Sequence, residues 1–144
     1  MAIRTSTAQW EGDLKAGKGT MTVGKGAYTG PFSFASRFEN SPGTNPEELL
    51  GAAHAGCFSM ALSHGLASAG STPKSVHTKA DVHFGQDPAG GFKISKIELT
   101  VDAEVPGLDK AKFDKIVEET KNGCPISKVL KGGAEISVNA RLKS

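Results

Sequence analysis

One stretch of the sequence, Asn45–Gly70, limits the fold of this chain more than any other. It predicts a single long helix that is apolar on nearly every side and carries Cys57 close to its middle. A helix without a polar face is unsuited to a surface, so the rest of the chain, or a second copy of it, must cover this helix. The surroundings that this cover creates decide whether the thiol of Cys57 is inert or reactive.

The residues before the helix indicate how it begins. Thr44 or Asn45 can cap its first turn, and Pro46 suits the first helical position. Thr44 with Glu47 also matches a capping box, so the pattern alone favours a capping role for Glu47 over a catalytic one. Gly70 is typical of a residue that ends a helix.

Strands are predicted on both sides of the long helix. Alternation of apolar and polar residues, bounded by turn residues, predicts strands over Ile3–Trp10, Thr20–Val23, Ala27–Arg37, Val76–Phe84, Phe92–Val105 and Ala134–Leu142. A second helix is predicted over Asp109–Lys121, and a short helical turn follows Cys124 and Pro125.

This order of elements indicates an α+β fold in which antiparallel sheets pack around the long buried helix. The 144 residues are enough for one domain with its own core, so we predict a single domain over residues 1–144. Because small sheets leave part of an apolar helix uncovered, we expect an intertwined homodimer that buries the long helices between its sheets.

Composition argues against several classes of function. The net charge is +2 and the Lys and Arg residues are scattered, so nothing favours binding to nucleic acid. The first residues contain no apolar run, and no stretch reaches the roughly 18 apolar residues of a membrane span. We therefore expect no membrane association and a location in the cytoplasm.

The two cysteines, Cys57 and Cys124, suggest free thiols, a metal pair or a redox pair in a chain without an export signal. Cys124 precedes Pro125 at the start of a helical turn, where unpaired N–H groups and the helix dipole favour a thiolate. Cys57 lies in apolar surroundings, where burial raises the pKa of a thiol. Local rules thus make Cys124 the more reactive thiol unless a cation reaches Cys57. Arg37 is a candidate for that cation, although it could equally be a surface charge.

A zinc site is one alternative use of the thiols. His54, Cys57 and His64 share roughly one face of the long helix, and with Cys124 they could form a Cys2His2 set. However, His64 lies about 10 Å along the helix axis from Cys57, which is too far for a single ion. We therefore favour a hydrogen-bonded core or interface histidine at position 54 and predict no metal.

Two segments carry a specific pattern: Thr44–Leu62, which contains Cys57, and Gly123–Leu130, which contains Cys124. Together they resemble the family of osmotically inducible protein C and the organic hydroperoxide resistance proteins. The similarity extends over the whole chain and includes Trp10–Gly12 and Arg37–Glu39. The placement of Arg37–Phe38 and of the histidine at position 54 is similar to the osmotically inducible branch.

The resemblance implies a thiol peroxidase that reduces organic hydroperoxides to alcohols. Cys57 would be the peroxidatic cysteine, which becomes a sulfenic acid, and Cys124 the resolving cysteine, which closes a disulfide with it. Arg37 would stabilise the Cys57 thiolate and polarise the peroxide, and Glu47 would orient Arg37. Glu47 stands ten residues before Cys57, as in the family, and the neighbouring Glu48 remains an alternative by pattern alone.

The resemblance also implies partners. The family fold is an intertwined homodimer with two sites at the subunit interface, and no cofactor is implied. An external dithiol, for which the family suggests lipoyl groups or small thiols, must reduce the disulfide. An alkyl or lipid peroxide would suit the expected apolar wall better than hydrogen peroxide; this wall consists of Phe32, Phe34, Phe58, Met60 and Leu62.

The spacing of Glu47 and Cys57 creates a geometric conflict, because ten residues of straight helix separate them by about 15 Å along the axis. We predict either that the helix breaks after its first turn or that Glu47 serves the Cys57 of the partner subunit. Two other functions remain as alternatives: a non-enzymatic thiol redox or metal sensor, and a structural dimer with inert cysteines.

Overall fold

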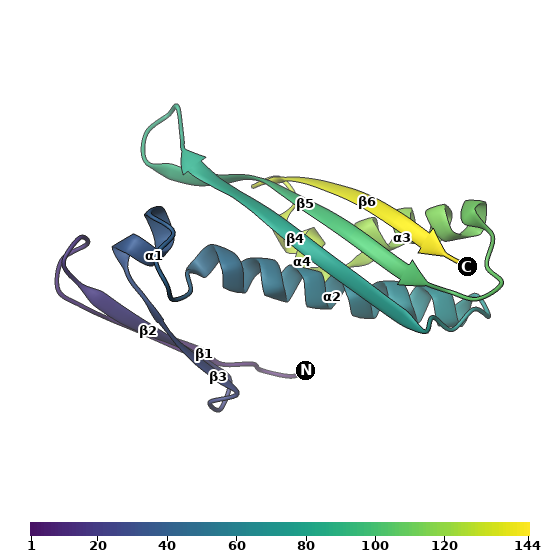
Figure 1. Ribbon diagram of the computed structural model, residues 1–144, viewed down its shortest axis with the longest axis horizontal. Helices are drawn as coiled ribbons and strands as arrows, with labels where there is room; N and C mark the ends of the chain where they lie inside the picture. The colour runs from purple at the N-terminus through teal and green to yellow at the C-terminus, as the bar shows by residue number, and fades with distance from the viewer. The chain divides into compact units, whose positions relative to one another are not determined.

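An antiparallel three-stranded meander opens the chain (Figure 1). The computed structural model describes residues 1–144, and the chain divides into two units, Met1–Leu49 and Leu50–Ser144. The meander lies in the first unit and consists of β1 (Ser6–Glu11), β2 (Lys18–Val23) and β3 (Tyr28–Phe32), paired in that order. The single domain expected over residues 1–144 stays a prediction.

The expected strand over Ala27–Arg37 is wrong in its second half, where the chain forms the short helix α1 (Phe34–Phe38). Ser33 and Ser36 fix the start of this helix, because the hydroxyl of each accepts a hydrogen bond from the backbone N–H of the other. This capping box overrides the alternating pattern of the segment. As a result, Arg37 projects from the last turn of a helix rather than from a strand.

The long helix α2 (Pro46–Ser68) is one continuous element, close to the range expected from the sequence. Asn45 caps it by accepting a hydrogen bond at 2.8 Å from the backbone N–H of Glu48. The expected capping box of Thr44 with Glu47 is wrong, because the Thr44 hydroxyl donates instead to the Glu48 carboxylate at 3.0 Å. The continuous helix also excludes a break after its first turn.

The second unit contains a three-stranded sheet in the order β4 (Ser75–Gln86), β5 (Phe92–Glu104) and β6 (Glu135–Lys143). The antiparallel pairing of β4 with β5 is confirmed, whereas β6 lies parallel to β5. A parallel neighbour requires a crossover much longer than a hairpin turn. The helices α3 (Lys110–Gly123) and α4 (Pro125–Leu130) form that crossover.

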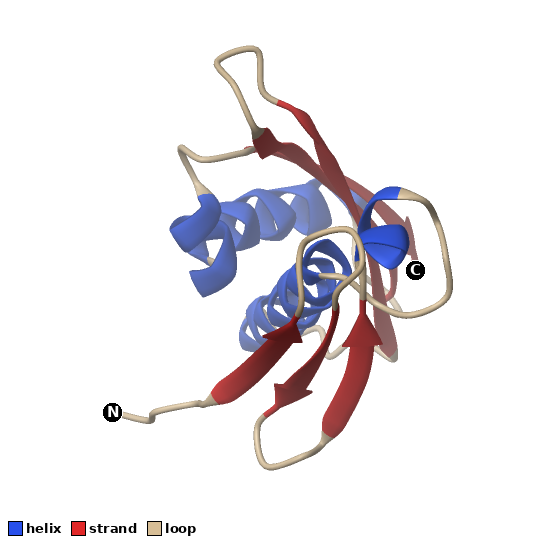
Figure 2. Cartoon of the chain, turned by 90° about the vertical axis from the view of Figure 1, so that its left-hand side faces the viewer, coloured by secondary structure: helices blue, strands red, loops and turns tan.

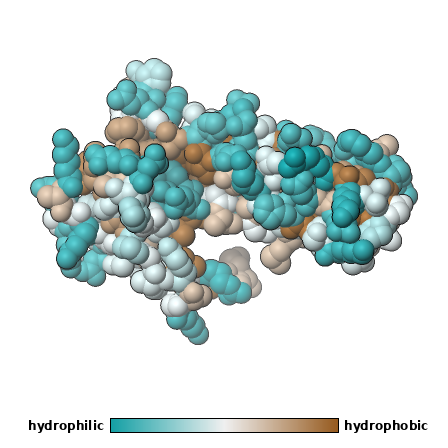
Figure 3. Space-filling view, in the orientation of Figure 1, coloured by the Kyte–Doolittle hydropathy of each residue, from teal (hydrophilic) through white to brown (hydrophobic).

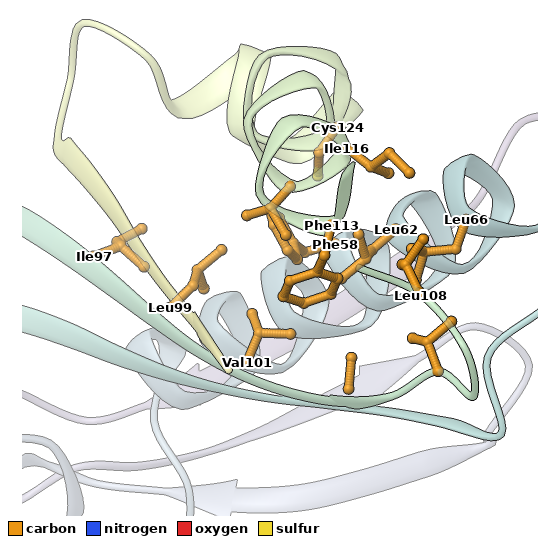
Figure 4. Packing of buried hydrophobic residues seen from close by; sticks show 13 residues of the cluster. Phe58, Leu62, Leu66, Ile97, Leu99, Val101, Leu108, Phe113, Ile116 and Cys124 are labelled. Atoms are coloured by element: carbon orange, nitrogen blue, oxygen red, sulfur yellow. The ribbon is translucent and has the colours of Figure 1, made fainter. Parts of the chain in front are cut away.

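The core of the second unit lies between this sheet and the helices, which lie on the same side of it (Figure 2). Three side chains of α2, spaced four residues apart, are fully buried: Phe58, Leu62 and Leu66. Figure 4 shows them facing residues of β5 and α3, among them Ile97, Leu99, Val101, Phe113 and Ile116. Full burial of such a side chain stabilises the fold by about 1.5–3 kcal/mol.

Two glycines allow α2 to pack closely within this unit. A Cβ atom on Gly65 would lie 3.0 Å from Cγ2 of Ile116 in α3, and one on Gly51 would lie 3.2 Å from Cγ2 of Val82 in β4. Gly56 differs from both, because a Cβ atom there would have no neighbour within 4 Å. Its side of the helix is exposed and also carries Ala52, Ala53 and Met60. Within one protomer, α2 is therefore buried on one side and exposed on the other, so the prediction that it is covered on all sides holds only in part.

Polar groups cover most of the face shown in Figure 3, and hydrophobic areas on it are small. The residues of strand β4 alternate between exposed and half-buried positions along nearly the whole strand, so one face of this strand meets solvent.

No helix of the structure combines the length and the apolar character that a membrane crossing requires.

Candidate active site

Two free thiols lie against each other in the second unit. Cys57 projects from α2 and Cys124 from the junction between α3 and α4, and their Sγ atoms are 3.2 Å apart, with Cys124 donating. This separation is longer than the roughly 2.05 Å of a disulfide bond. The reduced thiols therefore share a hydrogen bond, and a small movement would bring them to bonding distance.

The local sequence explains how Cys124 reaches this position. Its backbone N–H closes α3 by donating to the carbonyl of Thr120 at 2.8 Å, and Pro125 follows as the first residue of α4. A residue before proline avoids the helical conformation, so the chain turns at Cys124 and aims the next helix in a new direction. The Cys124 side chain is fully buried and belongs to the hydrophobic core (Figure 4).

The two thiols have opposite acidities. Burial raises the pKa of the Cys57 thiol, and Cys124 raises it further, against a smaller opposing effect of the Ile126 backbone N–H. Burial by itself would also raise the pKa of Cys124. There, however, the polar groups of Ser127, the Cys57 thiol and the backbone N–H of Ile126 favour the ionised form, outweigh burial and lower the pKa. Within this unit Cys124 is the better thiolate, which agrees with the local rules applied to the sequence.

In the first unit, Arg37 and Glu47 form a tight ion pair. Nη2 of Arg37 donates to one carboxylate oxygen of Glu47 at 2.7 Å, and Nε lies 3.2 Å from both oxygens. Glu47 is 8% exposed, so the pair fixes the plane of the guanidinium group in partly buried surroundings. Glu47 thus does not cap α2, and Glu48 is engaged at the helix start by Thr44 and Asn45.

The structure therefore brings together Cys57 with Cys124 and Arg37 with Glu47. The catalytic roles of these four residues stay predictions. Phe58 and Leu62 are core residues with no exposed surface, so neither forms the wall toward a substrate that was expected of them, whereas Met60 is 77% exposed. No group of three or more His, Cys, Asp and Glu side chains is arranged to hold a metal ion.

His54 is a fully buried histidine, as expected, and its Nε2 atom lies 2.7 Å from the hydroxyl oxygen of Ser127. Ser127 is 3% exposed and was missed by the sequence analysis. The sequence offered one signal, the position of Ser127 in the first turn of α4, three residues after Cys124.

Comparison with known proteins identifies related sequences and folds. A family model described as "OsmC-like protein" matches residues 38–139. Peroxiredoxin OsmC of Escherichia coli is 53% identical over 138 residues, which cover 95% of this chain and 94% of that protein. An organic hydroperoxide resistance protein of Xanthomonas axonopodis pv. citri is 36% identical over 97 residues, 67% of this chain and 66% of that protein.

A solved structure extends this likeness to the fold. The organic hydroperoxide resistance protein OhrB of Bacillus subtilis superposes with a TM-score of 0.72 at 26% identity. The match covers 95% of this chain and 98% of the Bacillus chain. The α+β architecture is therefore shared along nearly the whole length of both proteins.

The buried His54 predicts a pH-dependent stability. Burial lowers its pKa below the ordinary 6.5, so the unfolded chain binds a proton at higher pH than the folded protein does. The contribution of His54 is therefore intact above about pH 6.5 and is lost as the pH falls below that value. We expect the free energy of unfolding to fall by up to about 1.4 kcal/mol per pH unit below it.

Urea unfolding of the native protein and of His54→Gln between about pH 7 and pH 5 measures this effect. The substitution should flatten the slope. Thr120→Val is the matched control, because it changes a buried side chain that does not titrate and should lower the stability equally at every pH. An identical slope for the native protein and His54→Gln would contradict the prediction.

Proposed function

The chain belongs to the OsmC-like protein family, in the branch of peroxiredoxin OsmC, and from this premise we propose that it reduces organic hydroperoxides to alcohols with its two cysteines. Its relatives include proteins named for peroxiredoxin activity and for organic hydroperoxide resistance. The observation that carries the proposal is the 3.2 Å approach of a half-buried thiol, Cys57, to a fully buried one, Cys124.

The different exposure of the two cysteines supports the roles proposed for them. A peroxide from solvent can reach the half-buried Cys57, whereas the enclosed Cys124 is in contact with Cys57 itself. The Cys57 thiolate attacks one oxygen of the hydroperoxide, the O–O bond breaks, and the alkoxide leaves as the alcohol after taking a proton. Cys57 is left as a sulfenic acid.

Cys124 completes the oxidation half of the cycle. Its thiolate attacks the sulfur of the Cys57 sulfenic acid, the S–O bond breaks, and hydroxide leaves as water after taking a proton. The short distance between the two Sγ atoms favours this step over further oxidation of Cys57 to the irreversible sulfinic acid. An external dithiol, such as a lipoyl group, then reduces the disulfide, and we expect the cycle to run in the cytoplasm.

Cys57 needs a nearby cation to react as a thiolate, because its surroundings within the second unit raise the pKa of its thiol. Arg37, oriented by Glu47, is the group we assign to this task. Along the unbroken helix α2, Glu47 lies about 15 Å from the Cys57 of its own chain. The proposal is therefore that Arg37 and Glu47 serve the Cys57 of the partner subunit in a homodimer.

The uncovered side of α2 supports this homodimer. It combines Ala52, Ala53, Gly56 and the 77% exposed Met60, all small or apolar. A glycine inside a helix destabilises it by roughly 0.5–1 kcal/mol relative to alanine. The open space at Gly56 gives that glycine no packing role within the protomer, whereas the close approach of a second copy would require it.

Substitution of each cysteine tests the reaction. Cys57→Ser should abolish the consumption of cumene hydroperoxide in the presence of a dithiol. After one equivalent of the peroxide, the mass of the intact native protein should fall by two hydrogens, whereas Cys124→Ser should gain oxygen. Full turnover in Cys57→Ser would refute the mechanism, and a single oxidation without turnover would favour a redox sensor instead.

Removing the cation should slow the first step. In Arg37→Met, we expect the oxidation of Cys57 to slow by roughly a hundredfold, the scale of losing one charged group that stabilises a transition state. Glu47→Gln should have a smaller effect in the same direction, because the guanidinium remains but is held less firmly. Stopped-flow measurement of a single turnover gives the rate directly. An unchanged rate in Arg37→Met would remove this residue from the mechanism.

A charge on the open side of α2 should separate the subunits. We expect Met60→Glu to convert a dimer into a monomer in light scattering, and to lose peroxidase activity because each site draws on both chains. Val129→Glu is the control, since Val129 is as exposed as Met60, at 80%, but lies on α4. A monomeric native protein, or a Met60→Glu variant that stays dimeric, would contradict the proposed assembly.

A further inference from the structure

Two polar side chains of the first unit tie the short helix α1 to the start of α2. Nδ2 of Asn45 donates to the carbonyl oxygen of Ser36 at 3.1 Å, while Oδ1 of the same amide accepts from the N–H of Glu48 at 2.8 Å. The hydroxyl of Ser36, a residue only 6% exposed, donates to the carbonyl oxygen of Thr44 at 2.7 Å. The reaction proposed above gives neither Asn45 nor Ser36 a part.

These hydrogen bonds lie directly beside the ion pair of Arg37 with Glu47. Arg37 follows Ser36 in the chain, and Glu47 stands two residues after Asn45. Nη2 of the arginine and the nearer carboxylate oxygen of the glutamate meet at 2.7 Å across the same junction. The two backbone segments that carry the ion pair are therefore joined to each other within one or two residues of it.

Helix α1 depends on this junction for its position. It has five residues, whereas an isolated helix in water is marginal below roughly 12–15 residues. The last carbonyls of a helix lack partners inside it, and Asn45 supplies one for Ser36. Gly43 lets the intervening loop approach, because its φ is 119° and a Cβ atom there would lie 3.3 Å from Cβ of Ser36. The placement of Arg37 thus follows from the junction.

The amide of Asn45 provides more than the cap of α2 requires. Asn, Asp and Ser cap helices about equally well, because each offers an oxygen that accepts from a backbone N–H group. Only Asn adds an N–H donor, and this donor is the group that bonds to Ser36. A substitution can therefore keep the cap of α2 and remove the tie to α1.

We propose that Asn45 and Ser36 are positioning residues that hold Arg37, together with Glu47, where its guanidinium group acts on the Cys57 thiolate and the hydroperoxide. The role rests on the peroxidase function proposed above. Both side chains act through Arg37 and exchange no proton in the reaction. A cation that is held less firmly is aligned less often with the charge of the transition state, so the oxidation of Cys57 slows.

Stopped-flow measurement of one turnover with cumene hydroperoxide tests this role. Asn45→Ser retains an acceptor for the N–H of Glu48 but has no N–H donor for Ser36, and should slow the oxidation of Cys57 by about tenfold. Ser36→Ala should act in the same direction. Thr44→Val is the matched control, because it removes only the hydroxyl that donates to the Glu48 carboxylate and leaves the carbonyl that accepts from Ser36. Its rate should stay native.

A double-mutant cycle separates positioning from a general structural effect. In an Arg37→Met background, neither Asn45→Ser nor Ser36→Ala should slow the oxidation further, because the group through which they act is gone. A purely structural effect would slow the reaction by the same factor in both backgrounds. If Ser36→Ala fails to fold, as judged by circular dichroism, Asn45→Ser still decides. A native rate in Asn45→Ser, or effects that multiply in the cycle, would overturn the proposal.

Nuclear magnetic resonance observes the ion pair without the reaction. Nε of Arg37 lies 3.2 Å from both carboxylate oxygens of Glu47, so its N–H should exchange slowly with water in the native protein and in Thr44→Val. In Asn45→Ser the exchange should be about tenfold faster at the same pH, and Arg37→Met identifies the signal. Equal exchange would overturn the positioning role and leave the peroxidase standing. A native protein whose Cys57 is not oxidised would refute the peroxidase, and with it this role, whatever the exchange shows.

Discussion

The burial of one apolar stripe on α2 sets the positions of the two neighbouring thiols. Phe58, Leu62 and Leu66 follow one another at intervals of four residues and leave the helix one orientation against the sheet and α3. His54 begins the same stripe and therefore points inward. Cys57 is rotated by about 100° from Phe58, so it lies at the edge of the stripe, half-buried, in contact with Cys124 and still accessible to solvent.

The more acidic of the two thiols is the one that solvent does not reach. The thiol with the lowered pKa, Cys124, is enclosed, and the thiol that solvent can reach, Cys57, has the raised pKa. An isolated second unit would therefore hold its accessible sulfur in the less reactive form. Under the proposed function, activation of Cys57 would therefore need a cation from outside this unit, the task proposed for Arg37.

The sequence predicted those features that depend on neighbouring residues. The long helix, the hairpin of β4 with β5 and the relative acidity of the two thiols all follow from local patterns. Ser127 was missed because its bond to His54 joins residues 73 positions apart, which only the tertiary fold brings together. The local pattern was wrong in giving Glu47 a capping role, because Asn45 takes over the cap and leaves the Glu47 carboxylate to Arg37, the pairing that the family resemblance implied.

The parallel pairing of β6 gives this fold a particular order of assembly. Strand β5 occupies the centre of its sheet, but the neighbour on its second edge consists of residues 135–143, made only after both crossover helices. During synthesis on the ribosome, β5 therefore presents an unpaired edge for about thirty residues of elongation. Nascent chains in that interval carry a surface suited to strand exchange and aggregation, which gives chaperones a reason to act on them.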